Sequence, residues 1–265
     1  MSDGTQEGTK IIKQVSDSYS FQWIDSPGDR LFFAVANPDN YEQMQLWITD
    51  GTDAGTKLLK TFAKNYSGTN NDHISVVWEL YDHWSNEEAP LFFLADDGVH
   101  GRELWQTDGT VSGTTLFKNL TPVDDAGEER GTQSVQVFRS WTDHPDEVMD
   151  DDIFILALSQ YGGGQSTLWH TDGSISGTNK LKDLNINSEN FGGWIQHIVN
   201  EGVLYFTIDD NQHGKELWVS DGTADGTRLV KDIKEGSEGS NIHLMYRPVR
   251  NAVYFNAKGS ELWRY

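Results

Sequence analysis

One phrase recurs five times along the chain: a Leu-Trp pair that leads into Asp-Gly-Thr or Asp-Gly-Ser and then into Gly-Thr. The Trp residues of this phrase are Trp47, Trp105, Trp169, Trp218 and Trp263. The fifth phrase stops after Leu262-Trp263, and the turn sequence that would complete it stands near the other terminus as Asp3-Gly4-Thr5. Because a repeat divided between the two ends is typical of a closed ring, the sequence predicts a ring of five units.

Each repeat carries short runs of β-branched and aromatic residues, bounded by Gly, Asp, Asn or Pro. In the second repeat the predicted strands cover residues 75–81, 90–95, 103–107 and 115–118. The second run of each repeat is almost entirely apolar, as in Leu91-Phe92-Phe93, which favours a strand packed on both faces. Four short strands per repeat predict a β-propeller with one four-stranded blade per repeat.

We therefore predict an all-β fold, a five-bladed β-propeller in which residues 1–265 form one domain. Residues 9–14 are expected to form the outer strand of the last blade, whose other strands lie within residues 241–265. Pairing these two segments would remove an open sheet edge, which otherwise invites aggregation.

Composition excludes several classes of function. The 265 residues include no cysteine, which excludes disulfides, thiolate metal sites and a cysteine nucleophile. The 20 Lys and Arg against 41 Asp and Glu give a formal net charge of −21, which argues against nucleic acid as a partner. No apolar run approaches the roughly 20 residues that span a bilayer, and the first residues do not read as a signal peptide, so membrane insertion is not expected. No feature of the sequence indicates an oligomeric state.

The repeated phrase is interpreted first as a structural element. In an Asp-Gly-Thr turn the Asp accepts backbone N–H groups, the Gly adopts a positive φ, and the Thr hydroxyl bonds to the residues that follow. The repeated Trp side chains are expected to pack between neighbouring blades, with the indole N–H bonded to a carbonyl. A ring of five identical ligand sites is the alternative interpretation.

A second phrase occurs twice, as Asp96-Asp97-Gly98-Val99-His100-Gly101 and as Asp209-Asp210-Asn211-Gln212-His213-Gly214. The carboxylates of Asp96, Asp97, Asp209 and Asp210 are weak candidates for a metal site, and calcium is the metal that carboxylate oxygens favour. A hydrogen-bonded turn is the preferred interpretation, because only two repeats carry the phrase and its ligand types are mixed. No cofactor is expected to be required.

The stretch from Glu216 to Ile233 resembles the tandem repeats of secreted and cell-surface bacterial proteins, including large adhesins. The resemblance extends over essentially the whole chain and implies an extracellular or cell-surface location. It does not imply a particular reaction. The five-blade count is also similar to the tachylectin-2 type of lectin propeller, in architecture alone.

Function is expected where the repeats differ, because loops on a rigid fold are free to vary. Aromatic side chains beside Asn or Asp suit carbohydrates, since a ring packs on the C–H face of a sugar while amides and carboxylates bond its hydroxyls. The predicted ligand-binding residues are Tyr41, Tyr66, Asn71, Asp72, Tyr161 and Trp194. The sequence thus predicts a non-catalytic, lectin-like or adhesin-like module that binds a glycan or another cell-surface ligand through one face of the propeller.

Two other classes of function stay open. Some five-bladed propellers are glycoside hydrolases, which need two carboxylates across one sugar, and the inner strands here offer Asp25 and Glu79. The long loops around His83 and His144 are a further candidate for a metal or general-base site. The third class is a structural or protein-interaction scaffold without a small ligand.

Overall fold

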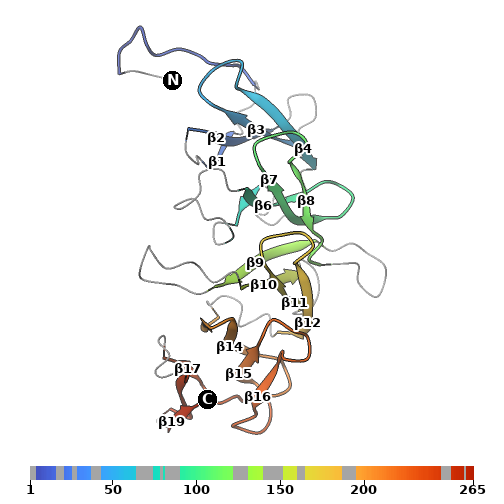
Figure 1. Cartoon of the computed structure of the whole chain (residues 1–265), viewed down its shortest axis with the longest axis vertical. Coiled ribbons are helices and arrows are strands. Elements are labelled where there is room, and N and C mark those ends of the chain that lie inside the picture. The colour runs from blue at the N-terminus through green and yellow to red at the C-terminus, as the bar shows by residue number, and fades with distance from the viewer. Residues whose placement is uncertain are drawn as a thin grey trace. The chain divides into compact units, whose positions relative to one another are not determined.

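The computed structural model describes residues 4–15, 21–25, 29–36, 43–63, 74–77, 80, 90–121, 131–139, 152–159, 165–186, 195–245, 252–259 and 261–265. These residues form strands and turns without any α-helix, so the chain is all-β as predicted (Figure 1). Consequently the described part of the chain contains no helix that could cross a membrane. The chain divides into two compact units, Met1–Gln133 and Ser134–Tyr265.

The first unit contains two four-stranded repeats. Their strands are β1 (Phe21–Asp25), β2 (Leu31–Ala36), β3 (Gln43–Thr49), β4 (Lys57–Ala63), β5 (Ser75–Val76), β6 (Leu91–Asp96), β7 (Arg102–Thr107) and β8 (Thr115–Lys118). Within each repeat, consecutive strands pair antiparallel. A single residue pair, Ala63 with Asp96, joins β4 to β6 and thus the two repeats into one sheet.

The second unit continues the same pattern. Its strands are β9 (Thr132–Phe138, which begins at the end of the first unit), β10 (Ile153–Ser159), β11 (Gln165–Thr171), β12 (Asn179–Asn185), β13 (His197–Asn200), β14 (Val203–Asp209), β15 (Lys215–Ser220), β16 (Arg228–Lys231), β17 (His243–Leu244), β18 (Tyr254–Ala257) and β19 (Glu261–Arg264). Strands β9–β12 and β13–β16 form two four-stranded sheets, and β17–β19 form a three-stranded sheet.

Every repeat sets its Trp in the same register. Trp47 lies opposite Phe33, Trp105 opposite Phe93, Trp169 opposite Ile155, Trp218 opposite Phe206, and Trp263 opposite Phe255. In the four complete repeats an irregularity in the pairing with the outer strand falls between the Leu and the Trp of the phrase. The repeated sequence therefore encodes one repeated backbone, including its bulge.

The apolar second strands form the core, as predicted. All six residues of β6 are buried, and the Leu of the repeat phrase is at most 1% exposed in the four complete repeats. Trp105, Trp169 and Trp218 are also buried. The Nζ atom of Lys60 lies 4.7 Å from the ring centroid of Trp105, so a Lys of one repeat covers the Trp of the next.

The Trp indoles follow the prediction of a bond to a carbonyl only in part. The indole N–H of Trp47 donates to a side chain, Gln45 Oε1, at 3.1 Å, and that of Trp263 donates to Glu261 Oε2 at 3.1 Å. The indole nitrogens of Trp105 and Trp218 are buried and have no hydrogen-bond partner among the described residues. Apolar packing, rather than a bond to a carbonyl, accounts for the position of these two side chains.

The predicted pairing of residues 9–14 with the last repeat is not confirmed. Residues 9–15 form no strand, and Ile11 is 87% exposed. The Lys13 ammonium instead donates to the carbonyl oxygens of Asp53, at 3.2 Å, and Thr56, at 3.0 Å, and so attaches the segment to the first repeat. The β17–β19 sheet correspondingly has three strands, and a closed ring of five blades stays a prediction.

Candidate functional site

The residues predicted to bind a ligand lie outside the described part of the structure. These are Tyr41, Tyr66, Asn71, Asp72, Tyr161 and Trp194. The loops that contain His83 and His144, and the residue Glu79, lie outside it as well. A shared pocket for these residues stays a prediction, and the described chemistry is that of the turns and of the buried acidic residues.

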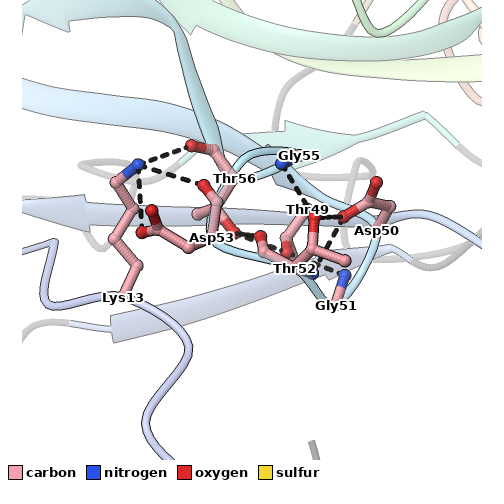
Figure 2. Close-up of polar contacts among 8 residues, drawn as sticks. All are labelled: Lys13, Thr49, Asp50, Gly51, Thr52, Asp53, Gly55 and Thr56. Atoms are coloured by element: carbon pink, nitrogen blue, oxygen red, sulfur yellow. Dashed lines mark hydrogen bonds and ion pairs between the residues drawn. The ribbon is translucent and has the colours of Figure 1, made fainter.

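The Asp-Gly-Thr turn is built on the side chain of its Asp (Figure 2). In the first repeat Asp50 Oδ1 accepts the backbone N–H of Thr52 at 2.9 Å and the Thr52 hydroxyl at 2.7 Å. Thr52 Oγ1 in turn accepts the N–H of Gly55 at 2.9 Å. The bonds from Thr52 hold the pKa of Asp50 below its ordinary value, with the hydroxyl as the largest cause. The carboxylate is therefore an acceptor that organises its own loop.

A pair of hydroxyls closes the base of this turn. Thr49 Oγ1 and Thr56 Oγ1 lie 2.7 Å apart in a buried position, and the Thr56 hydroxyl also approaches the carbonyl oxygen of Thr52 at 2.6 Å. The N–H of Gly51, whose φ is 86°, donates to Thr49 Oγ1 at 3.0 Å. The turn therefore satisfies its buried polar groups without a ligand.

The second Gly of the phrase is required because no Cβ atom fits at its position. A Cβ atom at Gly55 would lie 2.0 Å from Asp50 Oδ1, far inside van der Waals contact. The same overlap, at 1.9 or 2.0 Å, recurs for the second Gly of the three other complete phrases, Gly113, Gly177 and Gly226. The Gly-Thr pair of the repeat thus follows from the position of the Asp carboxylate.

The incomplete phrase near the N-terminus forms the same turn. The N–H of Gly8 donates to Thr5 Oγ1 at 2.9 Å, and the Thr9 hydroxyl donates to the carbonyl oxygen of Thr5 at 2.7 Å. Gly4 has a φ of 88°, close to the 86° of Gly51. Residues 4–9 therefore adopt the turn conformation of the repeat.

The second recurring phrase also forms a hydrogen-bonded turn. Asp96 Oδ1 accepts the N–H of Gly98 at 2.7 Å, and Asp97 Oδ1 accepts those of Val99, at 3.0 Å, and His100, at 2.9 Å. Asp97 Oδ2 lies 2.8 Å from His100 Nδ1. Burial pushes the pKa of Asp97 upward, but the backbone and ring of His100 outweigh it and hold the pKa below its ordinary value.

The turn of the fourth repeat has the same geometry. Asp209 Oδ1 accepts the N–H of Asn211 at 2.9 Å, Asp210 Oδ1 accepts that of His213 at 2.8 Å, and Asp210 Oδ2 lies 2.7 Å from His213 Nδ1. The bond to Asp210 raises the pKa of His213. Among the residues that the structure describes, no three His, Asp or Glu side chains are grouped so as to hold a metal ion.

A glutamate that precedes the Leu-Trp pair anchors the chain that follows its repeat. Glu103 is fully buried, and its carboxylate accepts the N–H of Leu120 at 2.8 Å and the hydroxyls of Thr121, at 2.6 Å, and Thr132, at 2.9 Å. Burial raises the pKa of Glu103 to about 7, against the opposing effect of these hydrogen bonds. Glu103 therefore joins β7 to the start of β9.

Glu216 holds the corresponding place in the fourth repeat. It is fully buried, and its Oε1 atom accepts the backbone N–H of Lys234 at 3.2 Å and the hydroxyl of Ser240. Sequence reasoning noted both glutamates only as neighbours of the second recurring phrase and did not predict that they anchor the chain. The available signal was the recurrence of Glu at this position in three of the five phrases, as Glu103, Glu216 and Glu261.

Comparisons with known proteins identify no family. No protein-family model matches the chain, and neither does any curated protein. Among solved structures, one from a study of two prolyl endopeptidases is 12% identical with a TM-score of 0.35, covering 92% of this chain and 34% of that one. The exo-β-1,3-galactanase 1,3Gal43A from Clostridium thermocellum is 11% identical with a TM-score of 0.31, covering 97% of this chain and 58% of that one. An α-L-arabinofuranosidase from the same organism is 12% identical with a TM-score of 0.32, covering 89% of this chain and 80% of that one.

Proposed function

We propose that the chain is a non-catalytic module that binds carbohydrate through loops that differ between its repeats. The proposal rests on one observation: the residues that all repeats share have a structural role, whereas the residues suited to sugars differ between repeats. Four complete repeats use their constant polar side chains to build the same self-contained turn, while aromatic, Asn and Asp side chains stand in segments that no other repeat shares. Aromatic rings beside amides and carboxylates are the side chains that sugars require.

The constant acidic residues support a binding role over a catalytic one. A glycoside hydrolase needs two carboxylates about 5–10 Å apart that face one sugar, one of them able to give up a proton. The carboxylates of the repeated turns accept hydrogen bonds within their own loops, and Glu103 is enclosed by three donors of the protein. We therefore place hydrolysis second, as an activity that would have to come from the variable loops alone.

A glycan array with the purified chain tests the proposal, in the presence and absence of a chelator. We expect binding to a defined set of sugars, and the chelator arm tests whether calcium takes part. Loss of binding in Tyr66→Ala or Asn71→Ala, with binding kept in the exposed control Val99→Ala, would assign the site to the variable loops. Release of free sugar from an oligosaccharide would support the hydrolase instead, and absence of both would support a protein-interaction scaffold.

The repeat resemblance supports an extracellular or cell-surface location, where glycans are exposed. A lectin-like or adhesin-like role follows from the same proposal. A surface-labelling experiment on intact source cells checks the location, and labelling only after lysis would contradict it.

We also propose that the five repeats are five blades and that residues 9–14 form the outer strand on β19. Lys10-Ile11-Ile12-Lys13 follows its turn as Lys57-Leu58-Leu59-Lys60 follows the first complete turn. Leu262 of β19 is 67% exposed, whereas the same Leu is at most 1% exposed in the other repeats, as expected for a sheet that lacks a partner on this side. Burying such an edge is the usual way in which all-β folds avoid aggregation.

Engineered cysteines test this pairing, because the chain has no cysteine of its own. In the complete repeats Ile48 pairs with Lys57 and Val219 pairs with Arg228. By analogy, the proposed strand would have Lys10 opposite Arg264. We expect Lys10→Cys/Arg264→Cys to form a disulfide within one molecule under dilute, oxidising conditions. The control Lys10→Cys/Arg228→Cys should stay reduced, since Arg228 already faces Val219. Disulfide-linked dimers, or no disulfide, would refute closure by the same chain.

A further inference from the structure

Two acidic side chains occupy opposite positions of β15 and the segment that follows β16. Leu217 pairs with Lys231, so the neighbouring residues Glu216 and Asp232 lie across from each other. Glu216 is fully buried. Glu216 Oε2 and Asp232 Oδ1 are both buried, and neither has a hydrogen-bond partner among the described residues. Two ionised carboxylates in this position would repel each other, and the buried oxygens that face each other would be poorly screened by water.

The two oxygens of Glu216 have different environments. Oε1 accepts the N–H of Lys234 and the hydroxyl of Ser240, and thus fastens the segment after β16 to β15. Oε2 lacks such donors. A proton on Oε2 would leave the two bonds at Oε1 in place and would turn Oε2 into a donor.

In the third repeat, the acidic residue in the position of Asp232 has a hydrogen-bond donor opposite it. Thr167 and Asp183 are paired there in the same register, and the Thr167 hydroxyl donates to Asp183 Oδ1 at 3.1 Å. In the first repeat the pair is Gln45 with Thr61, which carries no charge. At this position of the repeat, an acidic side chain is therefore stabilised by a hydrogen-bond donor on the neighbouring strand. In the fourth repeat the side chain in the position of Thr167 is Glu216.

We propose that Glu216 and Asp232 hold one proton between them at neutral pH, with Glu216 Oε2–H donating to Asp232 Oδ1. This bond would supply Glu216 Oε2 and Asp232 Oδ1 with a partner and would remove the charge of the buried Glu216. The segment from Asp232 to Ser240 is then held to β15 by a proton as well as by the bonds at Oε1, and deprotonation loosens it.

The charged groups around the pair are consistent with a retained proton. Burial raises the pKa of Glu216, and the charge of Asp232 acts in the same direction. The Lys234 ammonium is paired with Glu238, and His213 with Asp210. His213 is near enough for Asp232 and Glu216 to contribute to its raised pKa, but no described cation forms an ion pair with either carboxyl group.

The sign of the pH dependence follows from the raised pKa. The folded chain holds the Glu216 proton more tightly than the unfolded chain, whose glutamate titrates near 4.5. The contribution to stability is complete below that value and is lost as the pH rises through the folded pKa. Alkaline conditions should therefore weaken the fourth repeat.

The variant Asp232→Asn separates this bond from the rest of the fold. Its amide would donate to Glu216 Oε2 and make the proton unnecessary. We expect the melting temperature of the wild type to fall, as the pH is raised above the ordinary glutamate value of 4.5, more steeply than that of Asp232→Asn. Asp183→Asn is the matched control, because Thr167 already provides the donor there, and its pH profile should follow the wild type.

Carbon NMR of the Glu216 carboxyl group provides a direct readout on the full chain. We expect it to titrate above the ordinary glutamate range in the wild type and closer to that range in Asp232→Asn. An ionised Glu216 at neutral pH would overturn the proposal, and so would parallel pH profiles of wild type and Asp232→Asn. A rise in wild-type melting temperature on adding calcium at neutral pH, absent in Asp232→Asn, would assign the pair to a cation and overturn the proton.

Discussion

The variant Gly113→Ala should destabilise the second repeat by forcing the Asp108 carboxylate out of its turn. Gly113 does not have a positive φ, so an alanine meets no backbone strain there. Its Cβ atom would, however, lie 2.0 Å from Asp108 Oδ1. Asp108 Oδ1 accepts the N–H of Thr110 at 2.8 Å and the Thr110 hydroxyl at 2.7 Å, and both bonds would be lost when the carboxylate moves.

Two such bonds at an exposed turn contribute about 2 kcal/mol, at about 1 kcal/mol each. For a chain of this size that corresponds to a fall in melting temperature of about 4–8 °C. Thermal unfolding followed by far-ultraviolet circular dichroism measures the shift, and denaturant titration gives the free energy of unfolding.

A double-mutant cycle isolates the clash from other effects of the alanine. Asp108→Ala alone should lose the same two bonds and about the same stability. In the Asp108→Ala background Gly113→Ala meets no carboxylate, so it should have almost no further effect. Equal melting of Gly113→Ala and wild type, or a double variant that shows the sum of the two single losses, would refute the reasoning.

Three further predictions concern the core, a buried acid and the ligand. Trp105→Ala should lower the free energy of unfolding by about 3–5 kcal/mol in a denaturant titration, because the side chain is 3% exposed. The folded fraction of this variant should keep its glycan affinity. A variant that is as stable as the wild type but fails to bind would contradict this. Because the Glu103 pKa rises from 4.5 to about 7 on folding, Glu103 should account for a fall of about 3 kcal/mol in wild-type stability as the pH rises over that range. Glu103→Gln should remove that part of the fall and keep the part due to Glu216; pH profiles of equal slope for wild type and Glu103→Gln would count against this prediction. Tyr66→Ala should weaken glycan binding by about 1–3 kcal/mol in calorimetric titration while the melting temperature is kept; unchanged affinity would remove Tyr66 from the site.

The strands and turns could be predicted because the interactions that form them are local. The Asp50 turn depends on residues within seven positions of one another, and the apolar run of β6 is itself the buried strand. The inner strand of the second repeat is shorter than predicted, Ser75–Val76 instead of residues 75–81, within the residues described. The N-terminal strand was not confirmed, because residues 9–15 form no strand in the described structure and Lys13 bonds to the turn of the first repeat instead. Pairing between distant segments is not encoded in the local pattern of either segment.

The buried glutamates could not be predicted from their own residue type. A Glu is normally exposed, and the donors that make the burial of Glu103 possible lie 17 to 29 positions further along the chain. The hydrophobic periodicity predicts which residues face the core, but it does not predict which distant hydroxyl donates a hydrogen bond to a buried carboxylate. The signal for such a buried carboxylate is an acidic residue that recurs at the same position in several repeats.

The residue before Leu-Trp also shows which kind of variation between repeats indicates a binding site. This residue differs between repeats, yet these side chains form hydrogen bonds within their own sheet. The Thr167 hydroxyl donates to Asp183, and Gln45 accepts the indole N–H of Trp47. Difference between repeats is therefore not sufficient evidence of a ligand site, because a variable residue can be matched within its own sheet. The residues to test first are those in loops that have no counterpart in any other repeat. Tyr66 and Asn71 meet that condition, since they stand in a segment between the first and second repeats that the other repeats replace with unrelated sequence.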